Sequence, residues 1–152
     1  MRCVLQRVSS ASVTIDGAVR GAIERGLLVL LGVAENDTAA DAVWLAQKIA
    51  KLRIFPDDAD LMNRSVVDVQ GGVLVISQFT LLASTRKGTR PSFNDAAKPD
   101  AARALYEQFL VQMETALGGR PVSRGEFGAM MQVALVNDGP VTLILDTRQR
   151  DA

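Results

Sequence analysis

Two short polar segments of the chain carry side chains suited to chemistry, and the first of them is Ser77-Gln78-Phe79-Thr80-Leu81. It follows directly on the apolar run of residues 73–76. A buried strand that ends in such residues presents hydroxyl groups and backbone N–H groups at the edge of a sheet, where they can stabilise an oxyanion. Ser and Thr are also common in strands whose polar side faces water. Spacing alone favours that simpler interpretation.

The second segment is Asn137-Asp138-Gly139-Pro140-Val141-Thr142. Turn-forming residues between two apolar runs most often make a hairpin loop, so a structural turn is the first interpretation. Bonds that precede proline are cis in about 5–6% of folded cases, and glycine relieves the steric restriction at the position before proline. A Gly-Pro turn can therefore point two consecutive carbonyl oxygens in one direction.

The chain contains no histidine. This excludes a Ser-His-Asp triad, a Cys-His dyad and a histidine-based metal site. Because histidine alone has an unperturbed pKa near neutrality, acid–base chemistry at pH 7 must come from a shifted group, from backbone dipoles or from the substrate. The sequence also lacks a Gly-rich phosphate loop, a dinucleotide-binding fingerprint and zinc-ligand spacing, so we expect no metal and no cofactor.

Charge and composition limit the class of partner. Lys plus Arg and Asp plus Glu each number 17, and this balance argues against a strongly electrostatic nucleic-acid binder while leaving room for a small basic patch. We expect no DNA partner. The densest basic cluster, Arg86-Lys87-Gly88-Thr89-Arg90, is either a solvated loop or a contact for phosphates. A hydrophobic content of 48% without any apolar run of about 18 residues indicates a globular protein with no membrane span. The single cysteine, Cys3, fits a reducing cytoplasm and a buried position.

Short apolar runs separated by turn residues predict a sheet. Asp16-Gly17 and Gly71-Gly72 are hairpin signals. Residues 27–33 and 73–79 are apolar without alternation, so both faces of those strands should be covered. The expected strands are residues 4–8, 13–15, 18–23, 27–33, 65–69, 73–82, 132–136 and 141–146.

Two segments have the apolar period of a helix. The first spans residues 38–52 and begins with Thr38 and Asp41 spaced as a capping box. The second begins at Pro99 and stops at Gly118-Gly119. Strands joined mainly by hairpins, with two helices packed against them, predict a single α+β domain over residues 1–147 with a mainly antiparallel sheet. Residues 148–152 are expected to form a frayed tail.

Taken together, the two polar segments resemble the signature motifs of the D-aminoacyl-tRNA deacylase family. The resemblance implies a strongly curved, barrel-like sheet and a cytoplasmic homodimer. It also implies hydrolysis of the ester between a D-amino acid, or mischarged glycine, and the terminal adenosine of tRNA. The similarity extends over nearly the whole chain, through Gln6-Arg7-Val8, Ala11-Ser12-Val13, Gly26-Leu27-Leu28-Val29, Arg53-Ile54-Phe55, Met62-Asn63, Arg90-Pro91-Ser92-Phe93 and Met131-Gln132-Val133.

The resemblance assigns substrate binding to the second segment. It implies that Gly139-Pro140 is a cis peptide that reaches across the dimer, where its carbonyl oxygens meet the substrate's α-amino group and exclude the L-enantiomer. We call Gly139-Pro140 the wall of the site. Such a wall must be held rigid, and Arg7 is our candidate donor to the carbonyls of the motif. The other binding residues expected from the resemblance are Asn137 in the motif, Phe127 and Met131 around the adenine, and Arg86, Lys87 and Arg90 on the phosphates of the CCA end.

Catalysis is expected at the first segment, which also includes Ser77 and Gln78. Backbone N–H groups of Phe79 and Thr80 would stabilise the oxyanion, while the free ribose hydroxyl orients or activates water. Thr80 as a nucleophile is the competing hypothesis, although the motif holds no base to activate it. Two other functions stay open: a small oligomeric binding module for amino-acid-like metabolites, and an editing paralogue that acts on a different mischarged tRNA.

Overall fold

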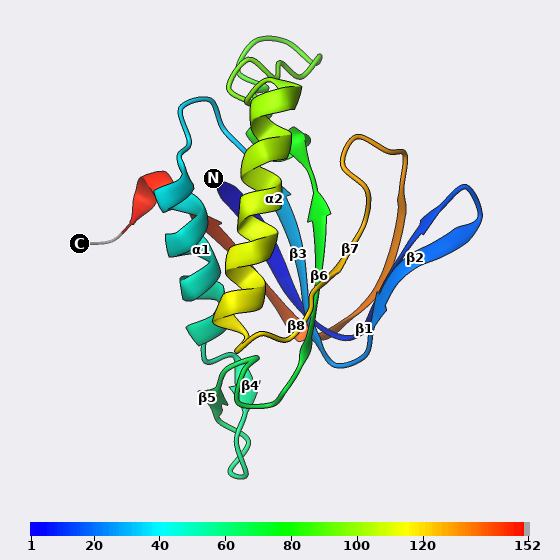
Figure 1. The fold of residues 1–152 in the computed structure, drawn as a ribbon, viewed down its shortest axis with the longest axis vertical. Coiled ribbons are helices and arrows are strands. Elements are labelled where there is room, and N and C mark those ends of the chain that lie inside the picture. The colour runs from blue at the N-terminus through cyan, green and yellow to red at the C-terminus, as the bar shows by residue number, and fades with distance from the viewer. Residues whose placement is uncertain (151–152) are drawn as a thin grey trace.

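A mixed, strongly bent sheet with two helices on one face makes up the fold that the computed structural model describes for residues 1–150 (Figure 1). The helices are α1 (Ala39–Lys51) and α2 (Pro99–Ala116), with two short 3₁₀ helices, η1 (Phe79–Leu82) and η2 (Thr147–Gln149). The strands are β1 (Arg2–Ile15), β2 (Ala18–Ile23), β3 (Gly26–Gly32), β4 (Phe55–Pro56), β5 (Met62–Arg64), β6 (Gly72–Ser77), β7 (Ser123–Arg124) and β8 (Gln132–Asp146).

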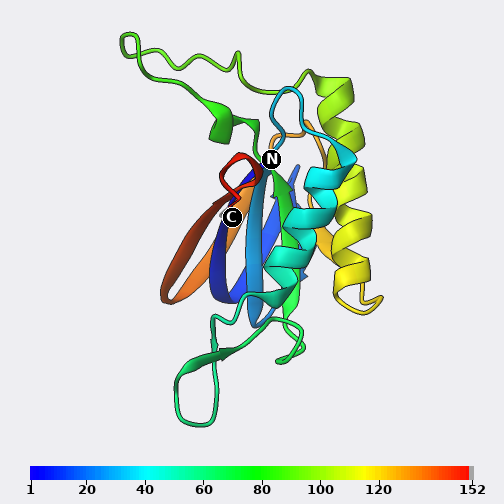
Figure 2. The ribbon, with the colours of Figure 1, turned by 90° about the vertical axis from the view of Figure 1, so that its left-hand side faces the viewer.

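The sheet has the strand order β2-β1-β3-β6-β7, and β8 pairs along β1. β3 pairs with β6, and β6 with β7, in parallel, whereas the pairs made by β1 are antiparallel. The prediction of a mainly antiparallel sheet was therefore partly wrong. The physical reason is that α1 and α2 are crossover connections, which return the chain to the end of the sheet where the next strand starts. Both helices consequently cover the same face (Figure 2).

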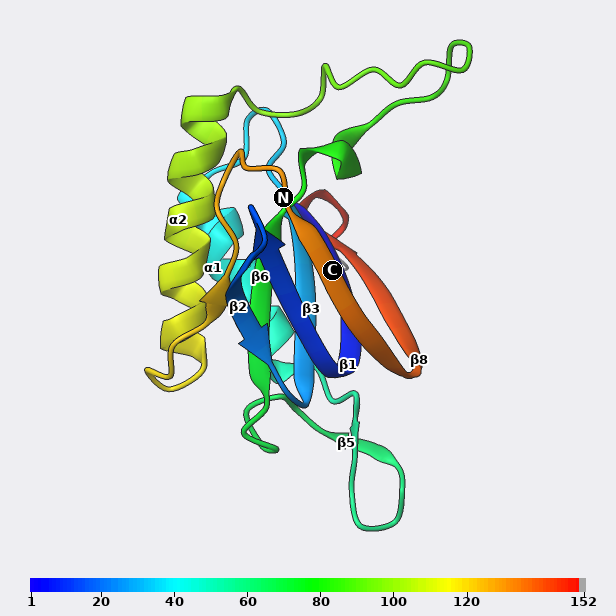
Figure 3. The same ribbon diagram turned by 90° about the vertical axis from the view of Figure 1, so that its right-hand side faces the viewer.

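Two long strands replace four of the short strands that the sequence predicts. β1 and β8 run antiparallel over most of their lengths and bend together (Figure 3). The register shifts between Gln6 and Val8 and again between Val8 and Ser10, as in the bulges that bend paired strands. The segment from Asn137 to Pro140 lies opposite this bend, inside β8. It is an irregularity within one strand, and the predicted hairpin loop between two strands was wrong.

The segment before β6 also differs from the prediction. Residues 65–69, predicted as a strand, form turns, so Gly71-Gly72 does not close a hairpin. Instead Gly72 pairs with Gly26 of β3, and a Cβ atom added to Gly26 would lie 1.9 Å from the Gly72 carbonyl oxygen. The glycines allow two parallel strands to approach closely. β6 itself ends at Ser77, and the remainder of the predicted strand turns into η1.

Apolar side chains fill both faces of the central strands. Leu27 and Val29 of β3 pack toward α1 and α2, while Leu28 packs with Leu74 and Ile76 in the hollow of the bent sheet. This confirms that the runs without alternation belong to strands covered on both faces. The capping box of α1 is also confirmed, because the Asp41 carboxylate accepts from the Thr38 N–H at 2.8 Å.

The end of the chain contacts α1 and the segment that precedes it. Arg148 donates to the Glu35 carbonyl oxygen at 2.8 Å, and Arg150 pairs with Asp41 and lies over the Trp44 ring. Residues 151–152, which belong to the predicted frayed tail, lie outside the described residues. None of the helices in residues 1–150 is long and apolar enough to cross a membrane.

Burial raises the pKa of the Cys3 thiol to about 12. Because folding raises this pKa, Cys3 leaves stability unchanged below its ordinary value of 9.0 and lowers stability as the pH rises from 9.0 toward about 12. We expect the urea midpoint of the wild type to fall between about pH 8 and about pH 10.5, and to fall less in Cys3→Ala. The comparison is needed because burial also raises the pKa of Tyr106 to about 12. Equal falls in the two proteins would contradict the prediction.

Candidate active site

The two polar segments lie at opposite ends of the sheet (Figure 3). Ser77 is the last residue of β6. Asn137 pairs with Val8 of β1. Val8 pairs in turn with Gly26 of β3, and Gly26 pairs with Gly72 at the start of β6, so Asn137 lies level with Gly72. The five residue steps from Gly72 to Ser77 span about 16 Å of extended chain. One copy of the chain therefore does not bring the two segments into one pocket.

Two adjacent backbone N–H groups are open at the start of η1. The Gln78 N–H donates to the Leu31 carbonyl oxygen at 2.7 Å and so completes the strand pairing. The Leu81 N–H donates back to the Gln78 carbonyl oxygen at 3.2 Å and closes the first turn. Between them, the N–H groups of Phe79 and Thr80 contact no acceptor within residues 1–150. Paired free donors of this kind suit an oxyanion.

Arg2 anchors η1, and the sequence analysis did not predict it. Its guanidinium donates to the Leu81 carbonyl oxygen at 3.0 Å and pairs with the Asp146 carboxylate at 2.9 Å. The arginine thus ties the turn that carries the free N–H groups to the end of β8. An arginine at a strand end carries no local signal for such a contact, because Leu81 is distant in the sequence.

The Thr80 hydroxyl accepts a hydrogen bond from the Gln78 side-chain amide. This amide holds the hydroxyl in place, but it does not take up a proton at neutral pH. A threonine nucleophile needs a neighbouring base, and the contacts of Thr80 provide none. The geometry at Thr80 therefore favours a positioning contact over nucleophilic attack. Ser77 is half-buried at the end of β6.

At the other end of the sheet, the Asn137 side chain holds a compact bulge. Its Oδ1 accepts from the Val141 N–H at 2.8 Å, and its Nδ2 donates to the Thr142 hydroxyl at 2.9 Å. The Gly139-Pro140 bond is cis, and both residues are exposed. Gly139 has a φ of 142°, and a Cβ atom there would lie 2.8 Å from Cγ2 of Val141. The position therefore requires glycine.

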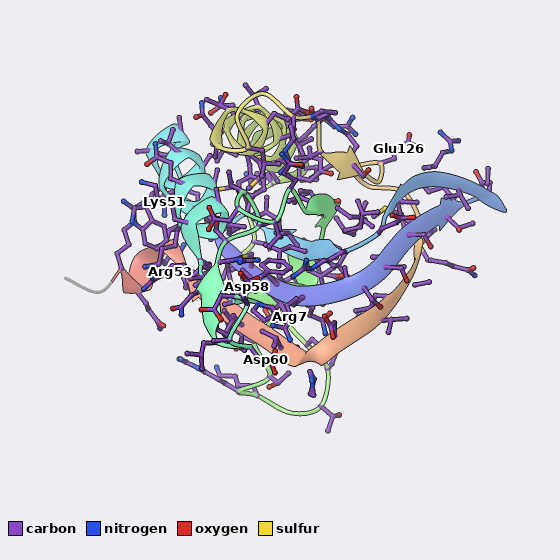
Figure 4. All side chains as sticks on the ribbon, turned by 90° about the horizontal axis from the view of Figure 1, so that it is seen from below. Arg7, Lys51, Arg53, Asp58, Asp60 and Glu126 are labelled. Carbon is purple, nitrogen blue, oxygen red and sulfur yellow. The ribbon has the colours of Figure 1, made fainter. Side chains whose placement is uncertain are left out.

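Arg7 lies beneath this bulge (Figure 4) and makes the contact expected of it. Its Nε donates to the Asp138 carbonyl oxygen at 2.9 Å, and its Nη1 donates to the Ile54 carbonyl oxygen at 2.6 Å. The side chain is only 11% exposed. The predicted donation to a carbonyl of the motif is thus confirmed. The guanidinium fixes the bulge to the segment that precedes β4.

Replacing Arg7 should destabilise the protein. Arg7→Met keeps the apolar stem but leaves the Asp138 and Ile54 carbonyls without their charged donor, at about 1.5–3 kcal/mol for each bond. We expect the free energy of unfolding in urea to fall by about 3 kcal/mol or more. Arg7→Lys keeps the charge and should recover part of the loss. A fall below about 1 kcal/mol in Arg7→Met would mean that the arginine does not brace the bulge.

A family model described as D-Tyr-tRNA(Tyr) deacylase matches residues 4–146 of the chain. The chain belongs to this family. It is 68% identical over 151 residues to the D-aminoacyl-tRNA deacylase of Opitutus terrae, across 99% of this chain and 100% of the relative. It is 60% identical over 147 residues to that of Roseiflexus castenholzii, across 97% and 92% of the two chains.

Solved structures share the fold. The chain superimposes on the c-Myc DNA Unwinding Element Binding Protein with a TM-score of 0.90 and 41% identity, covering 96% of this chain and 98% of that one. It superimposes on a probable eukaryotic D-amino acid tRNA deacylase with a TM-score of 0.79 and 18% identity, covering 95% and 97%. The second likeness shows the fold alone. The nearly closed sheet expected of this deacylase family is therefore present.

Phe127 and Met131, expected around the adenine of a deacylase substrate, lie in different apolar clusters. The Phe127 ring packs against Tyr106 with centroids 5.7 Å apart, and the Arg103 guanidinium lies 5.2 Å from the centroid of the Phe127 ring. Met131 packs in the hollow of the bent sheet. Both side chains are half-buried, so each keeps an accessible portion. Their adenine-binding role stays a prediction.

The basic loop belongs to a long arm that follows the first motif in the chain and projects away from η1 (Figure 3). Arg86, Lys87 and Arg90 are exposed in the segment that follows η1. Phe93 returns from this segment to place its ring edge-on against Phe79, with centroids 5.1 Å apart. The two motifs thus lie in separate places on one deacylase chain: the catalytic segment at η1, and Arg7 with the bulge of β8.

Proposed function

We propose that this protein is a D-aminoacyl-tRNA deacylase. It hydrolyses the ester that joins a D-amino acid, or mischarged glycine, to the terminal adenosine of tRNA, and it spares the L-aminoacyl ester. It acts as a homodimer in the cytoplasm. The match to the family over residues 4–146 and the high identity to named deacylases support this activity. Because an aminoacyl ester is already activated, its hydrolysis requires only water and a site that stabilises charge.

The observation that carries the mechanism is the separation of the two motifs. Ser77 and Asn137 lie about 16 Å apart along the strand direction within one chain. A site that uses both motifs is therefore built from two chains, in which Gly139-Pro140 of one enters beside Phe79 and Thr80 of the other. A two-fold dimer makes two such sites, because each interface contact occurs twice.

At the catalytic segment, the N–H groups of Phe79 and Thr80 donate to the ester carbonyl oxygen as water attacks the carbonyl carbon. The tetrahedral intermediate carries its negative charge on that oxygen, where the donors stabilise it. The bond from carbon to the ribose oxygen then breaks. The proton released by the attacking water passes to the ribose oxygen of the leaving adenosine, with the neighbouring ribose hydroxyl orienting the water.

Stereochemical selection takes place at the wall from the partner chain. The carbonyl oxygens of Gly139 and Pro140 accept from the substrate's α-ammonium group, so the D side chain points to solvent. An L side chain would collide with the wall, and rejection by collision is independent of side-chain identity. Glycine has no side chain and is accepted. Arg7 keeps the wall rigid through its hydrogen bond to Asp138.

Thr80→Ala distinguishes this mechanism from nucleophilic catalysis. The substitution removes the hydroxyl and keeps the backbone N–H, so we expect kcat on D-Tyr-tRNA to stay within about tenfold of wild type. Single-turnover hydrolysis measures the chemical step. Loss of a true nucleophile lowers kcat by about 10⁴-fold or more, and a loss of that size would assign attack to Thr80.

The proposed function is tested with D-Tyr-tRNA and L-Tyr-tRNA in parallel. We expect hydrolysis of the D-ester alone. Hydrolysis of the L-ester would identify an editing paralogue with a different substrate. Binding of free D-tyrosine without hydrolysis of either ester would identify a metabolite-binding module. Gel-filtration with light scattering completes the test, since a monomer would contradict a site that two chains share.

A further inference from the structure

A basic groove lies at the end of α1, outside both motifs. Lys48 and Lys51 stand one turn apart on the exposed side of α1, and Arg53 follows immediately after the helix. With Trp44 and Gln47 they line a hollow of about 360 Å³. Lys51 and Arg53 also line an adjoining hollow of about 430 Å³. We call this surface the α1 groove.

Within residues 1–150, the cations of the α1 groove form no close ion pair. Among residues 1–150, no carboxylate lies within 4.0 Å of the side-chain nitrogens of Lys48, Lys51 or Arg53. The one acidic residue in the lining is Asp68, and its carboxylate accepts from the Ser65 N–H at 2.8 Å. Asp68 also interacts with Arg53 at longer range, but one carboxylate facing three cations leaves an excess of positive charge that an anionic ligand would reduce.

Lysines in the last turn of a helix often serve only to offset the helix dipole. That role accounts for Lys48 and Lys51, but Arg53 lies beyond the helix and its capping residue, Leu52. The helix dipole also does not explain why the three side chains border a shared hollow. The arrangement fits the recognition of spaced phosphates better than it fits capping alone.

The α1 groove adjoins the wall of the proposed site. Arg53 is the neighbour of Ile54, whose carbonyl oxygen accepts from Arg7, the residue that braces the bulge. Figure 4 shows Lys51 and Arg53 on the α1 side of this end of the molecule, and Asp58 and Asp60 nearer Arg7. Asp58 and Asp60 are not among the residues that line the α1 groove.

We propose that the α1 groove binds backbone phosphates of the tRNA acceptor end. This inference rests on the proposed function. The wall of one chain enters the partner's site, so Lys51 and Arg53 of the chain that supplies the wall stand at the mouth of that site. Nucleotides that precede the terminal adenosine pass this mouth. The basic loop, Arg86 to Arg90, projects on an arm of the chain that supplies the catalytic segment, and in this proposal it contacts the RNA from that chain.

The test removes charge from the α1 groove and compares two substrates. Lys48→Gln with Lys51→Gln, and the triple variant that adds Arg53→Gln, are assayed on D-Tyr-tRNA and on the D-tyrosyl ester of adenosine alone. The control matched to the double variant is Arg20→Gln with Lys98→Gln, which also removes two positive charges, from exposed positions elsewhere. Because three exposed charge contacts are lost, we expect the triple variant to raise KM for the tRNA about tenfold.

The expected pattern is specific to phosphate binding. The slope of log KM against log salt should fall by about 1.5 in the double variant and about 2 in the triple variant, with kcat unchanged. Turnover of the adenosine ester should stay at the wild-type level, which shows that the variants fold. An unchanged KM and salt slope for the tRNA would overturn the proposal, and so would equal effects in the control.

Two further outcomes distinguish this proposal from failure of the proposed function and from binding of DNA. If the wild type hydrolyses neither D-Tyr-tRNA nor the adenosine ester, the proposed function itself fails, and this inference fails with it. If the triple variant loses affinity for a DNA duplex while its KM for the tRNA is unchanged, the α1 groove binds DNA and the RNA proposal is overturned.

Discussion

Phe79→Pro should lower kcat on D-Tyr-tRNA by about 100- to 1000-fold, which corresponds to about 3–4 kcal/mol for one oxyanion donor. The substitution removes a single N–H group from the pair at the start of η1. Phe79 is the first residue of that helix, where proline is tolerated because no helical bond is lost. Gln78, which precedes it, has φ −146° and ψ 78° and so lies outside the α region that a following proline disfavours.

The control for this prediction is Phe79→Ala. It removes the same ring, which is 58% exposed and contacts Phe93, but it keeps the N–H group. We expect kcat of the alanine variant to remain within about tenfold of wild type, since no donor to the oxyanion is lost. Equal losses in the two variants would assign the effect to the ring and would exclude the Phe79 N–H as an oxyanion donor.

The pair of variants also bears on Thr80. If backbone N–H groups stabilise the oxyanion, Phe79→Pro should lower kcat strongly and Thr80→Ala should lower it only slightly. If the Thr80 hydroxyl attacks the ester, Thr80→Ala is at least as severe as the proline. The contact from the Gln78 amide to Thr80 favours the first pattern, because an amide does not accept the proton of an attacking hydroxyl.

Local features of the sequence predicted local features of the fold. The spacing of Thr38 and Asp41 identified the start of α1, and Asp16-Gly17 identified the turn between β1 and β2. Gly71-Gly72 carried an equally clear local signal that was wrong. A Cβ atom on Gly72 would lie 2.9 Å from the Ile23 side chain, and one on Gly26 would collide with Gly72 of the parallel strand, and contacts between residues distant in sequence cannot be recognised from a dipeptide.

The same distinction applies to the site. The chemistry of Phe79, Thr80 and Gly139 follows from their types and from the resemblance that their motifs carry. Their positions at opposite ends of the sheet follow only from the strand order and the continuous ladder between β1 and β8. In the α1 groove, apolar residues separate Lys48, Lys51 and Arg53 in the sequence. A count of local charge therefore favoured the loop at residues 86–90.

Two inactive variants should restore activity to each other. Phe79→Pro damages the catalytic segment and leaves the wall intact. Gly139→Val damages the wall, because its Cβ would lie 2.8 Å from Cγ2 of Val141, and leaves the catalytic segment intact. When a heterodimer is purified through a different affinity tag on each chain, one of its two sites combines the intact wall with the intact segment. We expect about half of the wild-type kcat/KM on D-Tyr-tRNA per dimer.

This recovery depends on sites that two chains share. If each chain formed its site alone, every site in the heterodimer would carry one damaged motif, and activity would be the mean of the two inactive parents. That result, or failure to isolate any heterodimer, would exclude a site shared between chains. It would also require Gly139 and Phe79 to meet within one chain, although the strand register places their motifs about 16 Å apart. Recovery leaves the partner chain as the source of the wall.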